Sequence, residues 1–138
     1  AGSPITTPEQ VDRPGIRIAV SARSAYDLWL TRNINHATLH RAEGLEAAVE
    51  LFARENLDAL AGLRPALLAD IARFPGARIL PGRFTAVQQA IGTSRAHPEA
   101  AAFLAHFVET AKTSGLVARL IERHGVQGLS VAPIVKSS

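Results

Sequence analysis

Short apolar runs alternate with amphipathic stripes along the first two thirds of the chain. Residues 15–20 carry β-branched side chains at every second position, which favours a buried strand. Ser24 then begins a helix that we expect to reach about Asn33, because serine is a favoured N-cap residue and Asp27 lies in the first turn. The opening pattern therefore predicts a strand, a tight turn and a helix.

The same alternation continues down the chain and ends in helices. Strands are expected at 37–41, 57–62 and 77–80, an extended segment at 85–92, and helices at 43–55, 64–74, 98–114 and 116–124. Strands that alternate with helices are typical of parallel sheets. We therefore predict an α/β fold, a three-layer αβα lobe with a small, mostly parallel sheet, followed by two C-terminal helices.

The turn after the first strand is the first candidate for chemistry. A strand that runs through Ser21–Ser24 into a helix N-terminus directs unpaired backbone N–H groups at one point, and these favour an anion. Arg23 adds a positive charge beside them. Because the carboxyl ends of parallel strands share one edge of a sheet, we expect the turn at residues 62–64 to lie next to this one.

Composition and charge narrow the possible partners. The chain has 138 residues, a formal net charge of +3 and no cysteine, so it has no disulfide and no thiolate metal site. Basic and acidic residues are interspersed without a basic block, and no nucleic-acid partner is expected. No run is apolar and long enough to span a membrane, and no leader pattern is visible.

The sequence gives little support for a catalytic site or a metal-binding site. Ser24, His40 and Asp58 supply the residue types of a hydrolytic triad, but the glycine-flanked serine elbow is missing. His36 and His40 have a spacing that binds metal only on a helix, and their stretch reads as a loop and a strand. We therefore expect no enzyme activity, no cofactor and no metal.

Four stretches, taken in order, resemble one known family. They are residues 7–20, the turn at 21–26, Asp58–Pro65, and the segments from residue 89 to the helix ending near residue 124. Together they are similar to the second lobe and C-terminal helices of periplasmic solute-binding proteins of ABC transporters, family 3, which have the type 2 periplasmic-binding fold. The resemblance implies a second lobe with its crossover strand at residues 1–92, and C-terminal helices at 93–138 that pack on an absent first lobe.

The resemblance also implies a site and a ligand. The family binds small solutes in the cleft between two lobes, and the aspartate that holds an amino-acid ammonium in the family corresponds to Leu63 here. An ammonium would lose a charge-assisted hydrogen bond worth roughly 1.5–3 kcal/mol. We therefore expect an organic anion or an amino-acid-like molecule rather than a standard amino acid. The ligand-binding residues implied are Arg23, Ser24, Ala25, Tyr26, Leu63 and Arg64.

The partners and location follow from the same resemblance. We expect a periplasmic protein that delivers its solute to an ABC permease, with this chain a fragment of it. Without a first lobe, the apolar faces of the C-terminal helices favour a homodimer, which could exchange those helices between its two copies. The alternative is the effector-sensing domain of a LysR-type transcription regulator, which shares the fold. The apolar positions that favour the homodimer are Leu104, Val108, Leu116 and Leu120.

Overall fold

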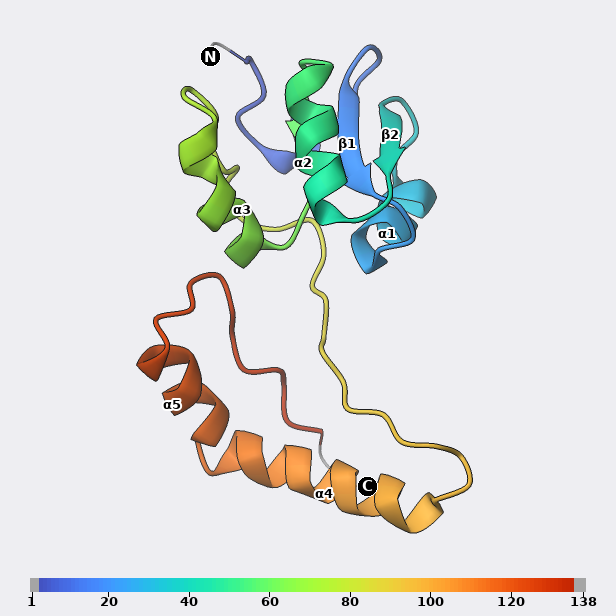
Figure 1. Ribbon diagram of the computed structural model, residues 1–138, viewed down its shortest axis with the longest axis vertical. Helices are drawn as coiled ribbons and strands as arrows, with labels where there is room; N and C mark the ends of the chain where they lie inside the picture. The colour runs from blue at the N-terminus through green and yellow to red at the C-terminus, as the bar shows by residue number, and fades with distance from the viewer. Residues whose placement is uncertain (1–2, 136–138) are drawn as a thin grey trace. The chain divides into compact units, whose positions relative to one another are not determined.

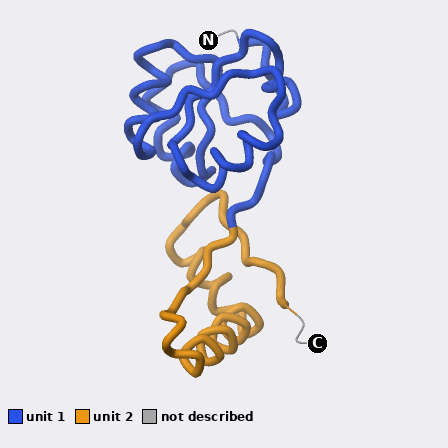
Figure 2. Tube along the Cα trace, turned by 90° about the vertical axis from the view of Figure 1, so that its right-hand side faces the viewer, with its two compact units in different colours: residues 1–87 blue, residues 88–138 orange. Residues whose placement is uncertain are grey.

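The chain divides into two compact units. The computed structural model describes residues 3–135, and its two units are residues 1–87 and 88–138 (Figure 2). The division falls a few residues before the boundary at residue 92 that the resemblance implies.

Unit 1 contains a small parallel sheet. Its strands are β1 (Arg17–Ser21), β2 (Thr38–Ala42) and β3 (Ala59–Leu60), in the order β2-β1-β3. Figure 1 shows β1 and β2 side by side. Both neighbours run parallel to β1, which confirms the expected α/β class and a parallel sheet. The short β3 is extended by the Asp58 N–H, which donates to the Arg17 carbonyl at 3.0 Å, and by the Ala61 N–H, which donates to Ala19 at 2.9 Å.

The predicted helices all occur, with ends within a few residues of those expected. A short 3₁₀ turn, Pro8–Gln10, comes first, and a second one, Ile71–Arg73, continues the third helix. The helices are α1 (Ala25–Asn33), α2 (Leu45–Arg54), α3 (Arg64–Asp70), α4 (Pro98–Thr113) and α5 (Leu116–Arg123). Helix α1 begins where the Ser24 side chain accepts the Asp27 N–H, and α2 forms over a stripe of apolar residues that includes the buried Ala48 and Val49.

The core of unit 1 lies around the central strand. Ile18 and Val20 of β1 are fully buried and cluster with Tyr26 and Leu30 of α1 and with Ala61. These two strand residues share one face because side chains alternate along a strand. Helix α2 also packs against β1, through a side on which Ala48 and Val49 are fully buried. Burial of β1 fixes the position of the turn that follows it.

The predictions of strands at 77–80 and within 85–92 are wrong. Among the described residues, no strand follows Leu60. The carbonyl of Leu80 accepts a hydrogen bond from the Arg64 guanidinium at 3.1 Å, and Arg64 also donates to Gly82. Apolar character predicted a strand here, but a strand needs a neighbouring backbone to pair with, and this segment takes a side chain as its partner instead.

Unit 2 consists of α4, α5 and the segments beside them. Lys112 on α4 has a side chain only 8% exposed, and its Nζ lies 2.6 Å from Glu109 and 2.8 Å from the carbonyl of Pro133. The N–H of Val135 donates to Glu109 at 3.1 Å, so the last described residues are fixed along α4. Within the described part of the chain, no helix is both long and apolar enough to cross a membrane.

Candidate functional site

The candidate site is the edge of the sheet where β1 and β3 end. These strands are parallel neighbours, so the turn from Ser21 to Ser24 and the turn from Ala61 to Arg64 emerge at the same edge. The chain leaves β1 toward β2 on one side, and reaches β3 on the other. Such a switch in strand order opens a crevice at the carboxyl ends of the strands, where ligands bind in open α/β sheets. The expected neighbourhood of the two turns is confirmed.

The turn after β1 is held by hydrogen bonds between Arg23, Ser24 and Asp27. The Ser24 hydroxyl donates to the Ser21 carbonyl at 2.7 Å and accepts the Asp27 N–H at 3.1 Å. The Asp27 carboxylate accepts the Arg23 N–H at 2.8 Å, which completes a variant of the capping box. Arg23 adopts a left-handed conformation with φ of 60°, unusual for a residue with a side chain. The Ser24 hydroxyl is therefore committed to the helix cap.

Asp27 holds this edge of the sheet together, a role that the sequence did not indicate. Its side chain is 6% exposed, and Arg41 of β2 donates to it from Nε at 2.9 Å. Arg41 also donates to the Thr31 hydroxyl at 2.8 Å. A serine followed three residues later by a carboxylate indicates a capping box from sequence alone. The pairing with Arg41 comes from another strand, and only the fold could reveal it.

Two backbone N–H groups remain for a ligand at the start of α1. Among the described residues, those of Ala25 and Tyr26 have no acceptor. Positions N1 and N2 of a helix cannot donate within the helix, and together they could hold one carboxylate. The Tyr26 side chain itself is buried in the core cluster, so this residue offers mainly its backbone.

The Arg23 guanidinium lies on the surface with one partner. It forms an ion pair with Glu43, in which the two side chains are 80% and 73% exposed. An exposed pair of this kind contributes about 0–1 kcal/mol, so an incoming anion can compete with Glu43. Arg23 is therefore available to a ligand at small cost.

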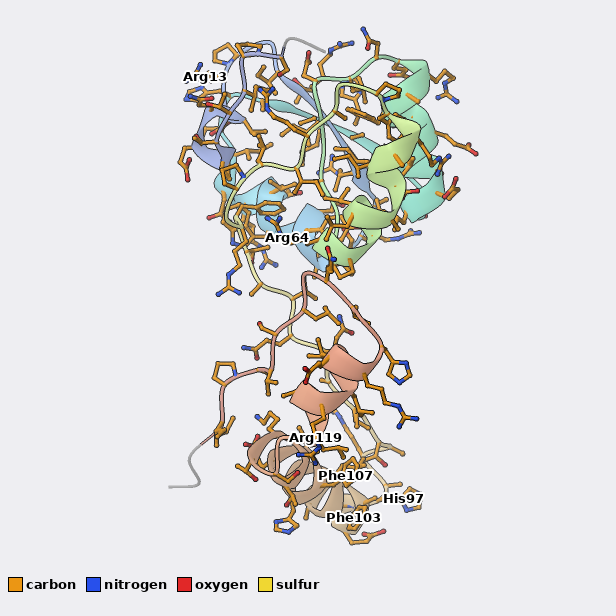
Figure 3. All side chains as sticks on the ribbon, turned by 90° about the vertical axis from the view of Figure 1, so that its left-hand side faces the viewer. Arg13, Arg64, His97, Phe103, Phe107 and Arg119 are labelled. Atoms are coloured by element: carbon orange, nitrogen blue, oxygen red, sulfur yellow. The ribbon has the colours of Figure 1, made fainter. Side chains whose placement is uncertain are left out.

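Leu63 and Arg64, from the second turn, differ in what they offer. Leu63 precedes α3 and is 41% exposed, so it presents an apolar surface at this edge. The guanidinium of Arg64 donates hydrogen bonds to the carbonyls of Leu80 and Gly82. Figure 3 labels Arg64, the first residue of α3. The residue expected to assist a ligand thus has a structural task already.

The residues considered for catalysis have separate partners. Ser24 caps α1, His40 lies 3.5 Å from Glu55, and Asp58 pairs with Arg17 at 3.1 Å. The structure does not link the three by hydrogen bonds as a triad requires. Within residues 3–135, no group of three or more histidine, aspartate or glutamate side chains is placed to hold a metal ion.

The fold and the edge together define an α/β unit whose strand order switches at the carboxyl ends of β1 and β3. A comparison with protein-family models, curated proteins and solved structures finds no match to this chain.

Proposed function

We propose that the chain is part of a solute-binding protein that captures a small solute, an organic anion or an amino-acid-like molecule, for an ABC importer in the periplasm. The observation that carries the proposal is the meeting of the turns after β1 and β3 at the switch point of the sheet. The resemblance of the four stretches to family 3 solute-binding proteins gives this edge its proposed task. The role is binding, without catalysis.

The ligand is held mainly by backbone donors and by the guanidinium of Arg23. The N–H groups of Ala25 and Tyr26 receive one anionic group. Arg23 exchanges its surface partner Glu43 for that group, since the ion pair between them is exposed and weak. Ser24 shapes the turn through its cap, Leu63 contacts an uncharged part of the solute, and Arg64 positions the neighbouring segment.

Calorimetry on the protein at its full natural length tests this proposal. We expect succinate or a similar organic acid to bind, and Arg23→Gln to weaken that binding several-fold. Arg32→Gln is the matched control, because Arg32 lies in the last turn of α1, at the far end of the helix from the site. Tight binding of a zwitterionic amino acid without binding of any organic acid would reject the anionic ligand. A broad solute panel without any binding would reject the function.

A further inference from the structure

Four charged side chains form two ion pairs beside the proposed solute site. Arg23 pairs with Glu43, and Asp27 pairs with Arg41 at 2.9 Å. The formal charges of these four side chains cancel, so the N-terminus of α1 supplies the remaining positive charge at this edge. A helix N-terminus acts as roughly half an elementary charge. A charge of that size favours one anionic group on the solute and gives little support to a second one.

Glu43 lies on the β2 side of the site. It directly follows β2, and the Ala22 N–H donates to the carbonyl of Ala42 at 2.8 Å, so the segment after β2 runs beside the turn after β1. The Glu43 carboxylate contacts the guanidinium of Arg23. An anion that takes the place of Glu43 at Arg23 therefore has a negative charge as its neighbour. A second negative charge on the same solute is repelled by that carboxylate.

A second carboxylate would also need a cation, and the neighbouring arginines are engaged. Arg41 donates to the buried carboxylate of Asp27. Arg64 donates to two backbone carbonyls in the segment after α3. Either arginine would have to give up hydrogen bonds that hold the fold, and a buried carboxylate left without its partner is costly. Arg23 is thus the arginine that this edge can offer to a solute.

The β3 side of the site is apolar. Leu63 precedes α3 and is 41% exposed, and β3 lies on the opposite side of β1 from β2. The turn after β1 therefore has a carboxylate on one side and an apolar side chain on the other. We propose that the solute is a monocarboxylate with an apolar remainder, and that Glu43 discriminates against a second negative charge. This inference rests on the proposed function and narrows its ligand class.

Calorimetry on the protein at its full natural length, with butyrate and succinate as probes, tests the inference. The two acids share a carbon chain length and differ by one carboxylate, and we expect butyrate to bind more tightly. Glu43→Gln removes a charge and keeps the size of the side chain, so it should raise the affinity for succinate about two- to fivefold more than that for butyrate. Glu50→Gln, on the exposed side of α2, removes the same charge and should leave the ratio of the two affinities unchanged.

The same comparison in about 1 M sodium chloride separates charge from shape, because the Debye length falls to about 3 Å. There the effect of Glu43→Gln should largely disappear. An unchanged affinity ratio in Glu43→Gln, an effect that persists in salt, or tighter binding of succinate by the natural protein would overturn the inference and leave the proposed function standing. Failure of every solute to bind would reject the proposed function and the inference with it.

Discussion

The carboxylate of Asp27 accepts the backbone N–H of Arg23 at 2.8 Å, and this bond holds the turn after β1 in its left-handed conformation. Asp27 is also paired with Arg41 from β2, so a single buried side chain links the turn, the helix α1 and the neighbouring strand. The arrangement explains how a turn without glycine at this position keeps a conformation that glycine adopts readily.

Asp27→Asn should destabilise the protein by about 1–3 kcal/mol, because the amide group cannot accept both hydrogen bonds and leaves Arg41 without its charged partner. Urea unfolding measures the free energy of unfolding. Glu122→Gln, an exposed carboxylate on α5, is the control and should change it by less than about 0.5 kcal/mol. Equal stability of the two variants would show that Asp27 does not hold the turn.

Asp12 should make stability depend on pH. Its carboxylate accepts the backbone N–H groups of Ala37, Asn35 and His36, and these bonds lower its pKa below the usual value of 3.8. A carboxyl group with a lowered pKa in the folded state stabilises the fold above its unfolded pKa. That stability is lost as the pH falls through the lowered value.

Asp12→Asn should therefore be less stable than the natural chain at pH 7, and the difference should shrink below about pH 4. Urea unfolding at pH 7, 5 and 3 measures it. Glu50→Gln, on the exposed side of α2, serves as the control and should show no such trend. A difference that stays constant with pH would mean that Asp12 acts through shape alone.

Arg64→Gln should loosen the segment around Leu80 and Gly82, because the shorter side chain cannot reach both carbonyls. Phe84 follows this segment, and its ring centroid lies 5.3 Å from that of Trp29. Trp29 is the single tryptophan of the chain, so its fluorescence should shift to longer wavelength. Arg83→Gln, an exposed neighbour, should leave the emission unchanged. Unchanged emission in the Arg64 variant would argue that Arg64 is free for a ligand.

Trypsin should first cut the native chain in the exposed stretch between the last 3₁₀ turn and α4. Arg83 and Arg95 are exposed there, and the stretch has no helix or strand. Trypsin cleaves an extended, accessible backbone. The backbone at Arg54 and Arg119 is helical, so cleavage there should be slower. Mass spectrometry identifies the first fragments. The double variant Arg83→Gln, Arg95→Gln should be cut more slowly, and early cleavage within α2 would contradict the division into two units.

Lys112→Met should release the last described residues from α4. The ammonium group of Lys112 binds Glu109 and the carbonyl of Pro133, and it lowers the pKa of Glu109. Without it, the amide of Val135, which donates to Glu109, should exchange hydrogen faster, whereas those of α1 should not change. Arg123→Met, on the exposed end of α5, is the control. Unaltered exchange would show that packing alone fixes this segment.

The sequence by itself determined the helices, the central strand and the parallel sheet. Local signals carry this information: Ser24 caps α1 with its own hydroxyl, and the β-branched run before it forms β1 in whatever context buries it. The position of the candidate edge also followed from sequence, because parallel strands bring their carboxyl ends together.

Only the tertiary structure decided which side chains were spent on holding the fold. Arg64 read as a ligand-binding cation, but the fold places two carbonyls within its reach, and the same contact removes the strand expected at 77–80. Arg41 reaches Asp27 from another strand, a pairing without any local pattern. Hydrogen bonds between distant residues depend on which parts of the chain the fold brings together. The periodicity of apolar residues along the sequence does not predict those contacts.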